Sequence, residues 1–194
     1  MKKWTTLMLA RAGIIAALYV ALSYAVLPVA SGAIQFRISE ALTILPLFYV
    51  ESIPALFIGC LLSNLLTGCL WQDIVFGSLT TLCAGIFTHL VGGALRNSAK
   101  HYLKIALGGL FPVLMNALIL PLIWLWAYGD ISLPFEWAAE YSTLILYGLQ
   151  VAFLLLSQSV AIYVCGSLLY ALFVKLERRL PDLFGSTRLK RENN

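Results

Sequence analysis

Long apolar segments recur along most of the chain, and short polar segments separate them. About 20 consecutive apolar residues form a helix long enough to cross the hydrocarbon layer of a membrane. The pattern therefore predicts an all-α, polytopic membrane protein whose spans form a six-helix bundle. The predicted spans cover approximately residues 7–27, 38–50, 53–70, 74–95, 104–127 and 143–174.

Two of these segments depart from the usual length of a span. The second, 38–50, is short and contains Pro46, and only the segment Glu51-Ser-Ile-Pro54 separates it from the third. We interpret this segment as a tight turn, because proline is favoured at the start of a helix. The sixth span is longer than a membrane requires, so we expect it to extend beyond the bilayer.

The composition also indicates membrane insertion. The chain of 194 residues is 61% hydrophobic and 11% charged, with a mean hydropathy of +0.89, whereas soluble domains carry about 25% charged residues. The length suits a single domain over residues 1–194, with a polar tail at 181–194. The first apolar run, from Leu7 to Val29, exceeds the hydrophobic region of a typical signal peptide, so we interpret it as a permanent span.

The cysteines and histidines give no sign of a metal site. Neither histidine stands at ligand spacing from the cysteines, and the sequence has no C-x-x-C pair. We expect the cysteines to act as small apolar residues in helix packing, without a disulfide, a metal or a cofactor. They are Cys60, Cys69, Cys83 and Cys165.

Positive residues predict how the chain is oriented, because Lys and Arg in short loops favour the cytoplasmic side. With six spans and a cytoplasmic N-terminus, the C-terminus is also cytoplasmic, and every Lys and Arg except Arg37 lies inside. If residues 38–70 crossed only once, either the cluster at 96–104 or the C-terminal cluster would face outward. The charges therefore favour six crossings.

The outer face predicted in this way is acidic. An acidic face attracts cationic or amine-bearing solutes, although the same excess would also follow from the positive-inside bias alone. Its charged residues are Glu40, Asp73, Asp130, Glu136 and Glu140 against Arg37.

Small residues recur at helical spacing in the first predicted span. Such residues let a second helix approach closely, because packing rather than the hydrophobic effect holds helices together in lipid. The partner helix could belong to the same bundle or to another membrane protein, and spacing leaves both open. The residues are Gly13, Ala17, Ala21 and Ala25, with Ala12 and Ala16 beside them.

Arg37 and Glu40 stand three residues apart at the start of the second predicted span, so they can share one helical face. Glu40 near a helix N-terminus is favoured by the helix dipole, whereas Arg37 is not. The pair could be an interfacial ion pair, or it could bind a solute, with Glu40 accepting hydrogen bonds.

Further polar and aromatic residues could belong to the same site. Asp73 follows Trp71 and precedes an apolar run, which is typical of an N-cap, although this segment also suits a flat heterocycle. Asn64 and Asn116 lie inside predicted spans and need hydrogen-bond partners, between helices or in a cavity. Trp124 belongs to a group of aromatic residues near the fifth loop, and aromatic residues also collect at membrane interfaces generally.

Catalytic signatures are missing from the sequence. It has no H-E-x-x-H, G-x-S-x-G or S-x-x-K motif with partners, so we do not expect an enzyme. It also has no G-x-x-x-x-G-K-[ST] phosphate loop. If the chain takes part in ATP-driven transport, another subunit hydrolyses the ATP.

One segment resembles a known family. Gly32-Ala-Ile-Gln-Phe-Arg-Ile-Ser-Glu-Ala-Leu-Thr-Ile-Leu-Pro46 is similar to the hallmark of the QueT-type queuosine-precursor transporters. The segments 53–64 and 73–82 extend the resemblance, which runs from about residue 8 to 175. These proteins resemble the substrate-binding S components of energy-coupling-factor (ECF) transporters.

The resemblance implies a fold, partners and a substrate. It implies a six-helix S component in the bacterial cell membrane, which docks on a transmembrane coupling subunit carrying two ATPase subunits, partly through the small residues of the first helix. It also implies that residues 28–36 close over the substrate, which would be queuine or its aminomethyl-deazaguanine precursor. The net charge of +4 lies in loops next to membrane spans, so it does not indicate a nucleic-acid partner.

The implied substrate fits the polar residues chemically. A guanine-like edge presents adjacent N–H donors, which one carboxylate such as Glu40 or Asp73 can accept, and a flat ring can stack on aromatic side chains. Two alternatives remain open: an S component for another vitamin or heterocycle, and an intramembrane enzyme acting on lipid or prenyl substrates. The candidate substrate-binding residues are Glu40, Arg37, Asp73, Asn64, Asn116, Gln35, Phe36, Trp71 and Trp124.

Overall fold

A computed structural model describes residues 4–27, 36–129, 133 and 140–180. Over these residues all regular structure is helical, as the sequence predicts, and no strand occurs. The elements are α1 (Thr6–Ala25), η1 (Ile38–Leu47), α3 (Ser52–Leu66), η2 (Asp73–Gly77), α4 (Ser78–Ala94), α5 (His101–Tyr128), α6 (Thr143–Ser159), η4 (Val160–Cys165) and α7 (Gly166–Arg179).

Several of these elements join into longer helices. The π-helical turn η2 continues into α4, and η4 connects α6 to α7 in one helix of 37 residues. In the described part of the chain, 4 helices are long and apolar enough to cross a membrane, while η1 and α3 are shorter and also apolar. The membrane-protein class is therefore confirmed, and crossing by η1 and α3 stays a prediction.

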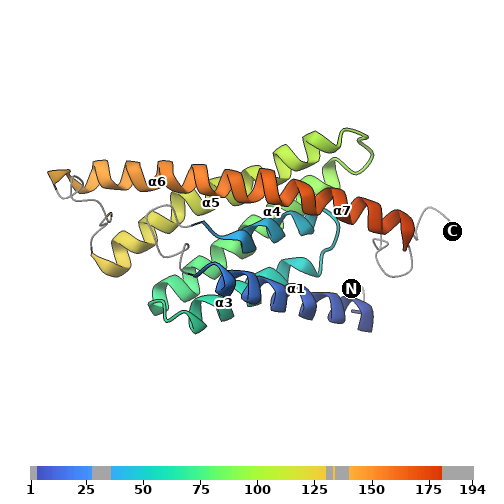
Figure 1. The fold of residues 1–194 in the computed structure, drawn as a ribbon, viewed down its shortest axis with the longest axis horizontal. Helices are drawn as coiled ribbons and strands as arrows, with labels where there is room; N and C mark the ends of the chain where they lie inside the picture. The colour runs from blue at the N-terminus through green and yellow to red at the C-terminus, as the bar shows by residue number, and fades with distance from the viewer. Residues whose placement is uncertain (1–3, 28–35, 130–132, 134–139, 181–194) are drawn as a thin grey trace.

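The second predicted span is a 3₁₀ helix at the centre of the bundle (Figure 1). All residues of η1 from Ser39 to Leu47 are buried, and α1, α4, α5 and α7 pack around it. A 3₁₀ helix rises about 2.0 Å per residue, so its 10 residues extend further than an α-helix of the same length would. The ring of His89 on α4 donates to the carbonyl of Pro46, at 2.8 Å, near the end of η1.

Glycines let neighbouring helices approach closely at several places, three of which involve α1 or the end of η1. A Cβ on Gly59 of α3 would lie 2.8 Å from the Cβ of Tyr19 on α1. A Cβ on Gly92 of α4 would lie 2.8 Å from the carbonyl oxygen of Leu47, and one on Gly108 of α5 would lie 2.9 Å from the Leu47 side chain. These close approaches position α1 and the end of η1 within the bundle.

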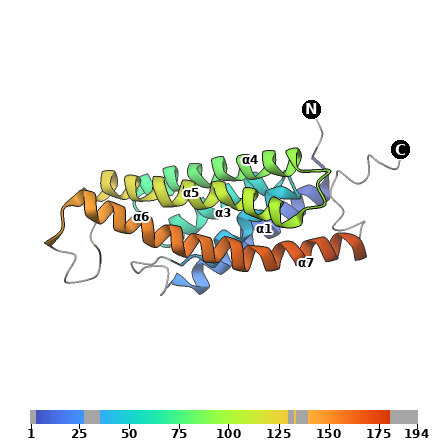
Figure 2. The ribbon, with the colours of Figure 1, turned by 90° about the horizontal axis from the view of Figure 1, so that it is seen from above.

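The two ends of the elongated bundle differ in charge. The start of α1 and the end of α7 lie at the same end (Figures 1 and 2). The turn between η1 and α3 lies there too, because Arg11 donates to Glu51 at 3.1 Å. Among the described residues, every Lys and Arg except Arg37 belongs to this end, which we call the basic end; these are Arg11, Arg96, Lys100, Lys104, Lys175, Arg178 and Arg179.

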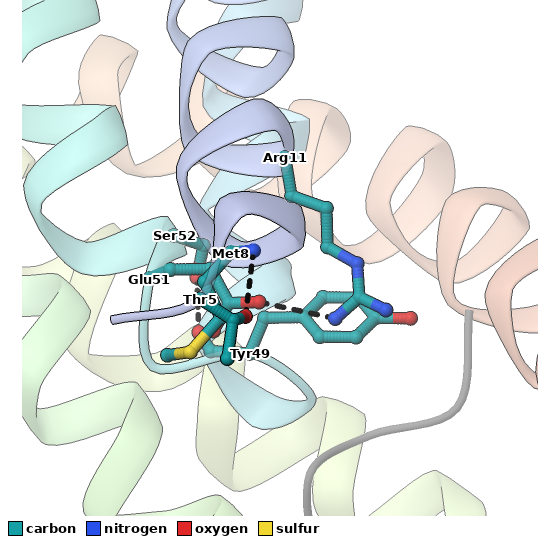
Figure 3. A network of polar contacts seen from close by, with 6 residues as sticks. All are labelled: Thr5, Met8, Arg11, Tyr49, Glu51 and Ser52. Carbon is teal, nitrogen blue, oxygen red and sulfur yellow. Dashed lines mark hydrogen bonds and ion pairs between the residues drawn. The ribbon is translucent and has the colours of Figure 1, made fainter. Parts of the chain in front are cut away.

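A compact polar group holds α1 to the basic end (Figure 3). Glu51 is fully buried, and the Arg11 guanidinium that it accepts from also lies 4.9 Å from the ring centroid of Tyr49. Ser52 donates to the carbonyl of Tyr49 at 2.6 Å, and Thr5 caps α1 by accepting from the backbone of Met8 at 3.3 Å. A turn does separate the two segments and is tied to the first helix, but it lies at residues 48–51, because α3 already begins at Ser52 and contains Pro54.

Candidate functional site

Buried polar side chains gather inside the bundle on the side of η1 away from the basic end. They come from seven elements spread along the sequence, and an apolar bundle has few other polar groups that they could contact. Intramembrane polar and ionisable side chains are costly, which makes them markers of functional sites. We call this set the interior polar cluster; it comprises Tyr19, Glu40, Cys60, Asn64, Asp73, Thr81, Asn116 and Gln158.

Glu40 is the most connected member of the interior polar cluster. It is 2% exposed, and its two carboxylate oxygens accept from different helices. The Tyr19 hydroxyl of α1 donates to Oε1 at 2.7 Å, and the Asn116 amide of α5 donates to Oε2 at 3.1 Å. The same amide donates to Oε1 of Gln158 on α6, at 3.3 Å. Glu40 therefore links α1, η1, α5 and α6.

Asp73 and Asn64 form the second half of the cluster. Asp73 is 3% exposed, and its Oδ1 has no hydrogen-bond partner. The Asn64 amide donates to the backbone carbonyl of Asp73 at 3.4 Å. A Cβ on Gly77 would lie 3.2 Å from Asp73 Oδ1 and 3.4 Å from Asn64 Nδ2, so the glycine leaves room for both side chains.

The N-cap interpretation of Asp73 is wrong. Helical residues already begin at Trp71, and Asp73 lies inside the π-helical turn η2, where its side chain caps no backbone N–H. The physical reason is that the chain turns into the helix two residues earlier than the apolar run indicates. π-Helical turns occur frequently at functional sites, and a second one, η4, follows Gln158 directly.

The other charged candidate, Arg37, makes no hydrogen bond to Glu40 in the part of the chain that the structure describes, although it interacts with the charges around it. Arg37 precedes η1 and is partly exposed. Its guanidinium interacts with the charge of Asp73 more strongly than with that of Glu40. Among the described residues Arg37 makes no ion pair with Glu40, and the charges of Asp73 and Glu40 both favour its positive form.

Cys69, in the connection before η2, also neighbours Asp73. Its Sγ lies 3.4 Å from the Thr67 hydroxyl, and either atom could be the donor. A thiol is a weak hydrogen-bond donor.

The aromatic candidates occupy different places. Trp71 is 60% exposed, and its ring contacts Trp126 edge-on at 6.0 Å, which is typical of an interfacial aromatic residue. Trp124 is partly buried and packs on the apolar cluster between α5 and α6 that contains Leu120. Phe36 is partly exposed. The structure places none of these rings in a described contact with the interior polar cluster, and Gln35 lies outside the described residues.

The small residues of α1 divide into two faces. Gly13, Ala17, Ala21 and Ala25 are exposed, and a Cβ on Gly13 would have no neighbour within 4 Å. We call this exposed face the α1 stripe. The other two residues, Ala12 and Ala16, pack on the buried cluster that contains Ile15, Tyr19 and Leu56.

Sequence reasoning missed several members of the interior polar cluster. Tyr19 was hidden among the apolar residues of α1, although it shares an inward face with Ile15 and Met8. Cys60 was interpreted as a packing residue, and it also accepts from Thr81 at 3.4 Å. The spacing of Tyr19 from Ile15, four residues along α1, is the signal that could have found the tyrosine.

Comparison with known proteins agrees with these observations. The QueT transporter family matches residues 9–175. Over 84 residues the chain is 40% identical to the "Queuosine precursor transporter QueT" of Lactococcus lactis subsp. cremoris (strain MG1363), and the match covers 42% of the chain and 49% of that relative. The aligned region thus spans about half the length of the relative. The comparison with solved structures found no match.

The family match covers most of the chain, including the helices that carry the interior polar cluster, and its members are transporters. A multi-pass membrane protein with buried polar side chains and without a catalytic motif agrees with that assignment. The chain belongs to the QueT transporter family.

Proposed function

We propose that this chain is the substrate-binding membrane subunit of an ATP-driven importer for a queuosine precursor, queuine or aminomethyl-deazaguanine. The observation that carries the proposal is the interior polar cluster, in which Glu40, Asp73, Asn64 and Asn116 are buried inside an apolar bundle. Its acceptors suit the N–H edge of a deazaguanine. The name of the lactococcal relative supports the same substrate class.

The location of the cluster suits uptake from outside the cell. The cluster and Arg37 lie away from the basic end, and positive residues favour the cytoplasm. A solute entering from the opposite face would therefore reach Asp73 and Glu40 without crossing the whole bundle. The lactococcal relative supports the bacterial cell membrane as the location.

Energy for transport comes from separate ATPase subunits, as in an S component of an ECF transporter. The chain has no phosphate-binding loop, so the coupling must pass through a partner. The α1 stripe supports this, because its small residues are exposed and would let a helix of a coupling subunit approach closely. The inward Ala12 and Ala16 are already used in the bundle.

The first test is a binding titration of the purified, detergent-solubilised chain, followed by quenching of its 5 tryptophans. We expect saturable, tight binding of queuine or aminomethyl-deazaguanine that guanine does not match. If folded protein responds to neither compound, the substrate assignment fails. Competition with thiamine and riboflavin tests the alternative, an S component for another vitamin or heterocycle.

The second test concerns energy coupling. Proteoliposomes that contain the chain with a coupling subunit and ATPases should accumulate the precursor only with ATP, and an Ala17→Leu, Ala21→Leu variant should bind normally but transport much less. The matched control is Ala16→Leu on the inward face, which should instead destabilise the fold. Transport without any partner ATPase would overturn this part of the proposal.

A further inference from the structure

The two carboxylates of the interior polar cluster differ in how their oxygens are used. Both oxygens of Glu40 already accept from the protein, one from Tyr19 and the other from Asn116. Oδ1 of Asp73 accepts from nothing, although it is buried. Buried polar atoms in proteins nearly always have a partner, so each exception requires an explanation.

The surroundings of Asp73 favour a ligand as that explanation. The adjacent residue, Gln72, carries a second buried acceptor without a partner, its side-chain Oε1. Arg37 compensates the charge of Asp73 from a distance and leaves Oδ1 without a donor. Residue 77 is a glycine, and a Cβ there would lie 3.2 Å from Oδ1 and crowd it. A charged acceptor and a neutral acceptor on adjacent residues, neither with a partner, suit a molecule that presents several donors.

We propose that Asp73 is the carboxylate that accepts the N–H edge of the substrate, and that Glu40 is a positioning residue that holds α1, η1 and α5 around it. This division of roles rests on the proposed function and deepens it. The ligand it specifies is a flat heterocycle with an amide N–H beside an exocyclic amino group, because adjacent donors can bind one carboxylate in bidentate fashion.

The proposal predicts which part of the substrate is recognised. An analogue that lacks the amino group on the pyrimidine ring leaves Asp73 with one donor fewer. Sites built to hydrogen-bond a group reject analogues that lack it, because the buried protein atom then stays unpaired. The wild-type chain should therefore bind aminomethyl-deazaguanine at least about tenfold more tightly than this analogue.

The decisive experiment combines two ligands with two variants in a binding titration. Asp73→Asn has the same shape but lacks the charged acceptor, and it should lower the preference for the amino-bearing ligand to within about threefold. The matched control, Glu40→Gln, should weaken binding of both ligands while the preference between them persists. A merely structural role for Asp73 would give the same pattern as the control.

The outcomes separate this inference from the proposed function. If the wild-type chain binds aminomethyl-deazaguanine tightly and Asp73→Asn keeps the wild-type preference, the role of Asp73 is wrong while the proposed function stands. If the folded wild-type chain binds neither ligand, both are overturned. Should Asp73→Asn fail to fold, Gly77→Ala replaces it, because its methyl group would crowd Oδ1 and should reduce binding of the amino-bearing ligand more than of the analogue.

Discussion

At the scale of single residues, Glu40 shows how an ionisable group is accommodated in an apolar bundle. Burial of a carboxylate is unfavourable unless hydrogen bonds and charges compensate it. Tyr19 and Asn116 supply donors on both oxygens, and Arg37 supplies a nearby positive charge. The donors come from two different helices, α1 and α5, and α1 adds a second bond to η1 from the Ser23 hydroxyl to the Ser39 hydroxyl at 2.8 Å. The carboxylate thus specifies how these helices are placed.

Changing Glu40 should therefore lower stability as well as binding. In Glu40→Gln, one carboxylate oxygen becomes an NH₂ group that can only donate. If it faces Tyr19, the hydroxyl can rotate to accept from it, but if it faces Asn116, two donors meet, because the Asn116 nitrogen cannot accept. We expect a loss of about 1–3 kcal/mol in the free energy of unfolding, measured by thermal denaturation in detergent. Gln158→Leu removes only the hydrogen bond between Asn116 and Gln158, so it should lower the free energy of unfolding by less. An unchanged melting temperature for Glu40→Gln would contradict the role of Glu40 in holding the helices together.

At the scale of elements, the contact between α1 and α3 depends on one glycine. Gly59→Ala places a methyl group 2.8 Å from the Cβ of Tyr19, where neither helix can yield without moving. Overpacking of this kind costs about 1–3 kcal/mol, so we expect a lower melting temperature. Gly148→Ala on α6 is the matched control, because its Cβ would meet nothing within 4 Å. Equal stability of the two variants would argue against close packing of α1 on α3.

The turn between η1 and α3 is a second place where one side chain fixes an element. Arg11→Met leaves Glu51 buried without its ion-pair partner, which typically costs about 3–5 kcal/mol. The double variant Arg11→Met, Glu51→Gln should recover most of the loss, because no uncompensated charge remains. Arg178→Gln, at an exposed position, serves as control. Thermal denaturation of the four proteins checks the prediction, and a double variant as unstable as Arg11→Met would refute it.

At the scale of the whole molecule, charge orients the chain. The basic end includes the connection before α5, and the opposite end includes the start of α6. In a variant whose four native cysteines are replaced, a cysteine at Asn97 should resist a membrane-impermeant maleimide in intact cells, whereas one at Glu140 should react. Both positions are exposed. Labelling at Asn97 alone would reverse the predicted orientation.

The apolar pattern predicted most of the fold and less of the site. The first, fourth, fifth and sixth predicted spans are confirmed as long helices within a few residues, because lipid requires long apolar runs. Composition cannot distinguish a buried 3₁₀ helix from a short α-helix, so the form of η1 was not predicted. The partners of Glu40 stand 21 and 76 residues away in the sequence, a distance at which helical periodicity carries no information.

One face of α1 is exposed on the surface of the molecule, and the opposite face contacts the interior polar cluster. Ala17 and Ala21 are exposed, and Tyr19, between them in sequence, reaches Glu40 on the inner side. Successive residues of an α-helix are about 100° apart, so a small roll of α1 about its own axis would withdraw the Tyr19 hydroxyl from the carboxylate. A protein bound to the exposed face of α1 would thus need only to rotate this helix about its axis to loosen the contacts of the Glu40 carboxylate on the opposite face.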